Sequence, residues 1–228
     1  MIVNSTDKIV ERQTAADDVF QNLRSQIVSL RLVPGTKLSE VEVARQYDVS
    51  RQPVREAFIR LSNMKLLQVR PQRATIVRKL SRHDLLNTRF VRIAIEVEIV
   101  QSACAAFDNR RIGFKQNLKQ QELAVARGEA ERFHELDYDF HHLLCIAAGC
   151  EFAFETIAEN KAHVDRLCMI SLADKDSMEV LFQDHSEIFA CLEAGDAERI
   201  VKLTRQHLSR LDQTLAAACE KHPEYFDD

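Results

Sequence analysis

The chain has 228 residues with a hydrophobic content of 46%, which is enough to bury a sizeable core in one large or two modest domains. It contains no run of about 18 uncharged apolar residues, and its N-terminus lacks the apolar core of a signal peptide, so we expect a cytoplasmic protein without a membrane span. The net charge of −4 conceals an asymmetry, because residues 1–80 hold 14 basic and 8 acidic side chains, whereas residues 81–228 hold 17 and 27. A basic N-terminal part is typical of a protein that binds a polyanion.

The six cysteines lie far apart and form neither a CxxC pair nor the tight spacing of a zinc ribbon. In a reducing compartment such residues are mostly small buried apolar side chains. We therefore expect a structural rather than a redox role for Cys104, Cys145, Cys150, Cys168, Cys191 and Cys219.

Two short helices are predicted first. One follows Thr14, which has the spacing of a capping box with Asp17, and it ends before a Pro-Gly turn. Ser39 and Glu42 repeat that spacing and open the second helix. The residues expected on its inward face are Val41, Val43 and Ala44.

A third helix is predicted to begin at Ser50, because Pro53 is tolerated in the first turn of a helix. Two short strands, residues 67–70 and 75–78, follow on either side of a turn at residues 71–74. Three helices followed by a hairpin is the order of a winged helix-turn-helix, with the hairpin as a small β wing. We therefore expect residues 1–80 to form a DNA-binding domain.

From Ser81 onward strand signals vanish and long amphipathic stretches follow. The expected helices are residues 82–107, 109–127, 130–148, 152–172, 176–194 and 196–220. The predicted fold class is mainly α, with an all-helical bundle over residues 81–228 that serves effector binding and dimerisation. Only the first dozen residues and the tail HPEYFDD are expected to be loose.

The start of the third helix carries the groups that base recognition requires. In a helix-turn-helix, the second helix of the pair enters the major groove with its N-terminal residues toward the base edges. Arg51 can donate two hydrogen bonds to guanine, and Gln52 can do the same for adenine. Backbone N–H groups at the helix start suit a phosphate, and the wing tip would reach the neighbouring groove. The candidate DNA contacts are Ser50, Arg51, Gln52, Arg55, Gln72 and Arg73.

The stretch LRLVPGTKLSEVEVARQYDVSRQPVREAFIRLSNMKLLQVRPQRATIVRKL resembles the DNA-binding domain of the GntR family of bacterial regulators. The resemblance rests on PG-x-x-L-x-E, VSR-x-PVREA and a hairpin after L-x-x-x-x-L. It implies DNA contact by the start of the third helix, with the wing around Arg73. Lys65 and Ala74 stand where the family commonly has glycine, which affects the detailed loop geometry.

The strongest chemical constellation lies in ERFHELDYDFHHLLCIAAGC. Asp137 and His141 are four residues apart, so on a helix they project from one face. His185 and His207 lie on later predicted helices with apolar neighbours, and both could point into the same interior. Three imidazoles and one carboxylate would hold Zn, Ni or Mn and leave positions for an oxygen ligand.

Spacing alone leaves other interpretations open. Asp139 with His142, and His134 with Asp137 or Tyr138, are competing pairs on the same helix. The histidines could equally be satisfied core or surface residues.

Residues from Ser81 to about Ala218 resemble the helical FCD domain of the fatty-acid-responsive subgroup of GntR regulators. The resemblance rests on R-x-x-x-E at Arg92 and Glu96, D-x-x-FH, H-x-x-I-x-x-x-L-x-x-GD, and a late histidine. Arg92 is thereby expected in the same cavity, where it would bind an anionic ligand. Without the resemblance, Arg92 and Glu96 would be a surface i,i+4 pair. Cys150 departs from the asparagine usual after AAG. The metal ligands implied are Asp137, His141, His185 and His207, in a register that excludes His142.

The sequence thus predicts a DNA-binding transcription regulator, more readily a repressor than an activator, rather than an enzyme. We expect a homodimer on double-stranded operator DNA, released when a small carboxylate binds at the metal-containing pocket. One alternative is a regulator for which the metal itself is the signal. A metal-dependent hydrolase or lyase is the other, disfavoured because no general base is evident beside the site and an enzyme needs no basic DNA-binding part.

Overall fold

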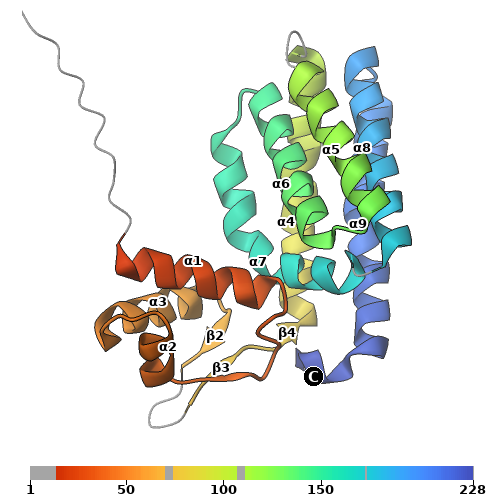
Figure 1. Ribbon diagram of the computed structural model, residues 1–228. Helices are drawn as coiled ribbons and strands as arrows, with labels where there is room; N and C mark the ends of the chain where they lie inside the picture. The colour runs from red at the N-terminus through yellow and green to blue at the C-terminus, as the bar shows by residue number, and fades with distance from the viewer. Residues whose placement is uncertain (1–13, 70–73, 107–110, 173, 228) are drawn as a thin grey trace, which may run out of the picture.

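The computed structural model describes residues 14–69, 74–106, 111–172 and 174–227 of the chain (Figure 1). In this part, short helices and a small sheet at the N-terminal end are followed by a bundle of long helices. The predicted fold class is confirmed, because the described chain is mainly helical, with a helix-turn-helix and hairpin ahead of the bundle. None of the described helices has the length and the hydropathy that a membrane span requires.

The N-terminal part combines three helices with a three-stranded antiparallel sheet. The predicted hairpin is present, with Gln68 opposite Ile76, whereas the strand at the other edge of the sheet was not predicted. Of the turn predicted at residues 71–74, residues 71–73, with Gln72 and Arg73, lie outside the described residues, as does residue 70 at the end of the first predicted strand. The helices are α1 (Ala15–Val28), α2 (Glu40–Gln46) and α3 (Arg51–Asn63), and the strands in spatial order are β1 (Lys37–Leu38), β3 (Thr75–Val77) and β2 (Leu67–Gln68).

Local signals explain where α1 and α2 begin. The predicted capping box is present at α1, where the Thr14 hydroxyl accepts from the Asp17 N–H at 3.2 Å and the Asp17 carboxylate accepts from the Thr14 N–H at 3.0 Å. Ser39 occupies the N-cap of α2, but its side chain makes no capping hydrogen bond. The first capping box is confirmed, and the second is wrong.

The inward face of α2 is narrower than predicted. Val43 and Ala44 are buried, whereas Val41 is 47% exposed. Two residues correspond to a rotation of roughly 200° around a helix, so Val41 lies opposite Val43. A helix of two turns presents only one of these faces to α3.

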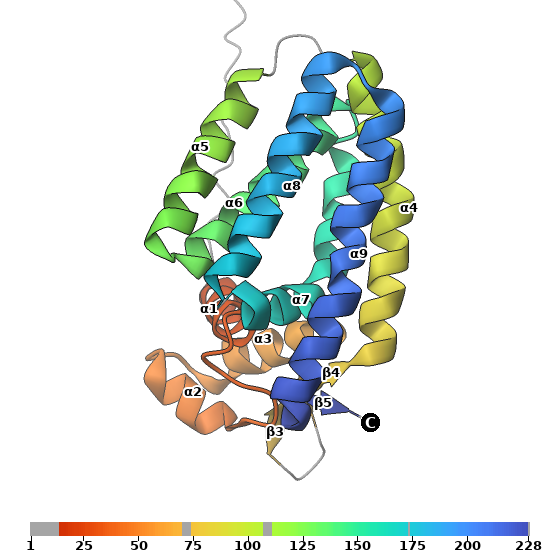
Figure 2. The same ribbon diagram turned by 90° about the vertical axis from the view of Figure 1, so that its right-hand side faces the viewer.

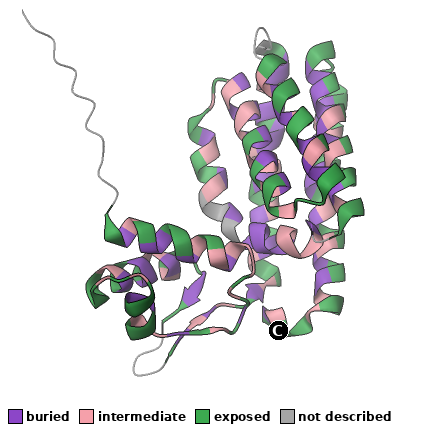
Figure 3. Cartoon of the chain, viewed as in Figure 1, coloured by how far each residue is buried: buried purple, intermediate pink, exposed green. Residues whose placement is uncertain are grey.

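In the described residues after position 81, six helices form the C-terminal bundle, close to the predicted bounds. α4 packs along α9, and α5 packs on α6 (Figure 2). Buried positions face the interior of the bundle, and exposed positions its outside (Figure 3). Of the cysteines, Cys104, Cys145 and Cys191 are buried, and Cys150, Cys168 and Cys219 are partly buried. The helices are α4 (Arg82–Ala106), α5 (Arg111–Arg127), α6 (Ala130–Ala147), α7 (Phe152–Leu172), α8 (Lys175–Ala194) and α9 (Ala197–Lys221).

The tail is ordered up to residue 227, contrary to prediction. After a 3₁₀ turn at Pro223–Tyr225, β5 (Phe226–Asp227) pairs in parallel with β4 (Leu80–Ser81). The physical reason is the Phe226 side chain, which is 5% exposed and packs in a cluster with Leu80, Leu85, Leu211 and Leu215. Phe226, with the partly buried Tyr225 beside it, thus holds the tail up to residue 227 beside the start of the bundle.

A buried arginine joins the bundle to the chain segment that leaves the sheet. Arg166 of α7 is fully buried, and it donates to the Arg78 carbonyl oxygen at 2.6 Å and to the His163 Nδ1 at 3.1 Å. Burial lowers the pKa of Arg166 to about 10. Burial and the Arg166 charge lower the pKa of His163 to about 4, which keeps this imidazole neutral.

The depressed pKa of His163 predicts a loss of stability in acid. Because the unfolded chain binds this proton near pH 6.5 and the folded chain does not, stability falls as the pH drops from about 6.5 toward 4. Between pH 7.5 and 5, the parent protein should lose about 2 kcal/mol more of its free energy of unfolding than a His163→Gln variant. Urea denaturation at both pH values measures this difference, and equal losses in the two proteins would contradict it.

Candidate DNA-contacting helix and candidate metal centre

The start of α3 presents two arginines to solvent. The side chains of Arg51 and Arg55 are 59% and 52% exposed, and Ser50 occupies the N-cap. Gln52 lies between them and donates to the Glu56 carboxylate at 3.0 Å. The opposite face of the helix is buried through Val54, Ala57, Phe58 and Leu61. α3 therefore docks by its apolar side and leaves its polar N-terminal end free to contact DNA.

Both arginines contact one carboxylate that the sequence analysis did not single out. Glu40, the first residue of α2, accepts from Arg51 at 3.0 Å and from Arg55 at 3.1 Å. The Arg55 hydrogen bond, followed by that of Arg51, lowers the pKa of Glu40 despite partial burial. Glu40 was visible only as the last letter of PG-x-x-L-x-E.

Four side chains from three helices of the bundle meet at one point, as predicted. Asp137 and His141 come from α6, His185 from α8 and His207 from α9, and one ligand atom of each lies within 4.8 Å of the others. The His141 Nε2 lies 3.4 Å from the His207 Nε2 and 3.8 Å from the Asp137 Oδ1. The His185 Nε2 lies 3.5 Å from that same oxygen.

The competing pairs on α6 point elsewhere. His142 stacks on Phe154 with ring centroids 4.3 Å apart, and His134 pairs with Asp165 at 3.1 Å. Asp139 lines surface pockets on either side of α6. The register with Asp137 and His141 is therefore the one that faces the bundle interior.

Each imidazole of the cluster has its own acceptor beside Nδ1. An acceptor there favours the tautomer with hydrogen on Nδ1, and this leaves the Nε2 lone pair directed into the cluster. His185 is hydrogen-bonded to Gln121 at 2.9 Å and His207 to Asp184 at 3.2 Å. The His141 Nδ1 lies 2.7 Å from the Glu96 Oε2, a close contact without the angles of a hydrogen bond.

Hydrogen bonds farther out fix the orientation of Gln121. The Asn117 amide N–H donates to the Leu136 carbonyl at 2.9 Å, so its oxygen is free to accept from the Gln121 amide at 2.7 Å. The Gln121 oxygen must then face the His185 Nδ1. The His185 Nε2 is left buried, without a hydrogen-bond partner among the described residues.

Burial and charge set the protonation of the cluster. Burial lowers the pKa of His141 against the effect of Glu96, and burial lowers the pKa of His185 well below its ordinary value, so both imidazoles are neutral. Burial opposes ionisation of Asp137, but the Lys161 ammonium beside it holds the pKa of this carboxyl well below its usual range.

The cluster fits a divalent cation. Neutral imidazole nitrogens and one carboxylate are ligands that Zn²⁺ and similar ions take. Ligand atoms about 2.1 Å from a shared ion are roughly 3 to 4 Å apart, and the three separations given above fall in that range. Without a cation, the facing lone pairs of His141 and His207 would repel each other in a buried setting.

Arg92 is buried beside the cluster rather than on the surface. Arg92 and Glu96 are 7% and 2% exposed, and the Arg92 Nε donates to the Glu96 carboxylate at 2.6 Å. The alternative of a surface pair is therefore wrong. A pocket of 60 Å³ lies next to them. It is lined by Arg92, Asp137 and His207, by the polar side chains of Ser171, Arg210 and Thr214, and by apolar side chains of α7, α8 and α9. The Cys168 thiol also lines it, and burial raises the pKa of that thiol to about 12, so it stays neutral.

Two regions of the chain match known families. Residues 15–77 match the bacterial regulatory proteins of the gntR family, and residues 88–210 match the FCD domain. The chain is 36% identical over 217 residues to the HTH-type transcriptional repressor RspR of Escherichia coli K12, with 95% of each chain covered. The chain belongs to the GntR family.

Other comparisons agree with the GntR assignment. An HTH-type transcriptional regulator of Streptomyces ambofaciens is 31% identical over 215 residues, covering 94% of this chain and 90% of that protein. The structure of E. coli McbR/YncC has the same fold, with a TM-score of 0.73 at 20% identity over 89% of this chain and 99% of that chain. This GntR protein is thus a DNA-binding transcription regulator and not an enzyme, as predicted.

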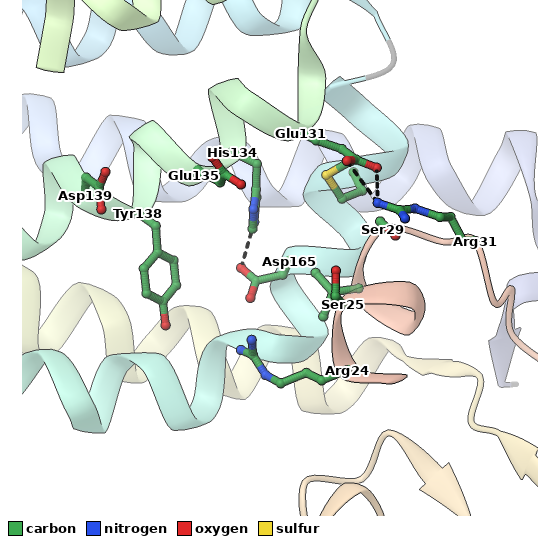
Figure 4. Close-up of a pocket in the computed structure, with 12 residues that line it drawn as sticks. Arg24, Ser25, Ser29, Arg31, Glu131, His134, Glu135, Tyr138, Asp139 and Asp165 are labelled. Carbon is green, nitrogen blue, oxygen red and sulfur yellow. Dashed lines mark hydrogen bonds and ion pairs between the residues drawn. The ribbon is translucent and has the colours of Figure 1, made fainter. Parts of the chain in front are cut away.

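A polar network of the GntR regulator extends from the cluster toward α1. Lys161 of α7 is 2% exposed and lies 2.9 Å from Asp137 and 3.7 Å from Asp165. Asp165 pairs in turn with His134, and both line a pocket of 360 Å³ between α6, α7 and α1, where Arg24 also lies (Figure 4). The available sequence signal was the spacing of four residues between Lys161 and Asp165.

The acceptor beside His185 supports a prediction for metal affinity. A Gln121→Met variant should bind Zn²⁺ about 10- to 100-fold more weakly than the parent, because the acceptor that fixes the His185 tautomer is lost. Competition with a chromophoric chelator measures the affinity. Gln120→Met, at an exposed neighbouring position, is the matched control. Equal affinity in both variants would contradict the orienting role of Gln121.

Proposed function

We propose that this GntR regulator is a homodimeric repressor whose operator affinity is controlled by a small carboxylate bound beside a divalent metal ion in the bundle. The observation that carries the proposal is the set of three buried imidazoles, each with an acceptor beside Nδ1 and its Nε2 directed into the cluster, next to a buried arginine. The relative RspR is named a repressor, which supports release from the operator as the response. Operator DNA implies a cytoplasmic location.

Asp137, His141, His185 and His207 would hold the ion, with Zn, Ni and Mn as candidates. A bound ion supplies positive charge that attracts an oxygen of the carboxylate. Arg92 lines the adjoining pocket, and its guanidinium has N–H groups beyond the one given to Glu96. The ligand would therefore lie between the cluster and Arg92, enclosed by the apolar and polar side chains that line the pocket.

Lys161 and Asp165 give the ligand site a contact route to the DNA-binding part. A change at Asp137 would alter its pairing with Lys161, and through Asp165 and His134 it would alter the pocket against α1. The ligand can change the affinity for DNA only by the difference between its own affinities for the DNA-bound and the DNA-free arrangement of the protein. This difference is typically about 1–3 kcal/mol. A dimer brings two α3 helices to half-sites about one helical turn apart, so small displacements change the fit.

DNA contact by α3 predicts a strong effect of its arginines. Arg51→Ala or Arg55→Ala should weaken binding to a preferred duplex by about 1–3 kcal/mol if the side chain makes a bidentate base contact. The DNA affinity of each variant should also depend less steeply on salt concentration where a phosphate contact is lost. Fluorescence anisotropy over a range of salt concentrations measures both quantities. Arg127→Ala removes the same charge from the exposed end of α5 and should change little. An equally large loss of DNA affinity in Arg127→Ala would contradict the assignment of Arg51 and Arg55 as DNA contacts.

Binding of a carboxylate is tested by thermal denaturation with a panel of small mono- and dicarboxylates. At least one acid should raise the melting temperature of the Zn²⁺-loaded protein and not of the chelator-treated protein. At 100 times its Kd, this acid should raise the free energy of unfolding by about 2.7 kcal/mol. The same acid should lower DNA affinity.

Arg92→Lys keeps the positive charge but loses the planar guanidinium with its paired N–H donors. It should therefore weaken the effect of the acid on the melting temperature and on DNA affinity. Arg89→Lys, on the same helix and paired with Asp212, is the control. A DNA response to metal alone, with no acid effective, would indicate a metal sensor instead.

A further inference from the structure

Glu40 connects the two arginines that face DNA. Its Oε2 accepts from the Arg51 guanidinium at 3.0 Å and from the Arg55 guanidinium at 3.1 Å, and its Oε1 lies 3.4 Å from the Arg55 Nε. Its side chain is 27% exposed, less than either arginine. The carboxylate therefore lies behind the guanidiniums, on the protein side of the DNA-contacting surface.

This contact leaves both guanidiniums able to bind a base. Each arginine has five N–H groups. Glu40 accepts from one of Arg51 and two of Arg55, so each retains more than the two that a bidentate contact with guanine requires. The carboxylate thus orients the arginines without blocking them.

Folding stability does not account for the arrangement. Arg51 and Arg55 are more than half exposed, and ion pairs of such exposed groups contribute little to stability. Without the carboxylate, however, two like charges four residues apart on α3 would repel each other and take up many rotamers. An ordered guanidinium loses less freedom on binding than a disordered one.

We propose that Glu40 is a positioning residue that determines DNA specificity. On a preferred site the arginines contact base edges while they keep their hydrogen bonds to Glu40. On other DNA they must leave Glu40 to contact phosphates, and the negative carboxylate repels the phosphates they approach. Glu40 therefore favours binding to the preferred DNA sequence over other sequences. This role is independent of the metal cluster.

The test compares affinity for two duplexes in the full-length protein. One duplex is selected by the parent protein from a random-sequence library, and the other is a scrambled version of the same composition. Glu40→Gln should bind the scrambled duplex more tightly and the selected duplex no more tightly, so that their affinity ratio falls roughly 5- to 30-fold. Glu42→Gln is the matched control, since Glu42 is an exposed residue of α2 outside the Glu40 contacts. It should raise both affinities in parallel and keep the ratio.

Further variants separate positioning from a structural role. Glu40→Asp keeps the negative charge on a side chain that is one methylene shorter, so it should restore part of the affinity ratio between the two duplexes. The melting temperature of Glu40→Gln should stay close to that of the parent. A ratio within twofold of the parent would overturn the proposal. So would an equal loss for both duplexes together with a lower melting temperature, because this result would assign Glu40 to the fold.

Discussion

Three imidazoles can be buried at one point only if each has a partner for the nitrogen that faces away from it. In this GntR regulator the partners come from three different helices, with Glu96 on α4, Gln121 on α5 and Asp184 on α8. Each acceptor favours hydrogen on Nδ1 and so leaves Nε2 as a lone pair. The positions of α4, α5, α6, α8 and α9 therefore depend on one another through the cluster. The same packing that satisfies the histidines creates a site that attracts a cation.

The polar interior of the bundle lies close to the DNA-binding part at two points. Lys161 and Asp165 lead from the cluster to the pocket against α1. Arg166, one residue after Asp165, holds the Arg78 carbonyl where the chain leaves the sheet. Both contacts arise from α7, and the more exposed ion pairs Arg31–Glu131 and Lys65–Asp84 add contacts from α6 and α4. Buried charged groups are costly unless paired, so few alternative arrangements of α7 satisfy all of them.

Much of the fold followed from local patterns, because long amphipathic helices and the Thr14 capping box depend on neighbours in sequence. Spacing alone did not decide between Asp137 with His141 and the competing pairs; the family resemblance did. Side chains whose role depends on packing were missed, among them Gln121, Glu40 and Lys161, since nothing in their local sequence indicates which distant group they meet. The tail was mispredicted for the same reason, because nothing in this polar segment indicates that Phe226 packs in an apolar cluster of residues that are distant in sequence.

The tautomers of His141, His185 and His207 test the central claim most directly. Nitrogen-15 NMR of the imidazole rings in Zn²⁺-loaded protein distinguishes a protonated from an unprotonated nitrogen at each position. The account predicts that all three rings carry hydrogen on Nδ1 and that Nε2 is unprotonated at neutral pH. Hydrogen on Nε2 in two or more of these rings would contradict it, because the lone pairs would then point away from the place where an ion is proposed to bind.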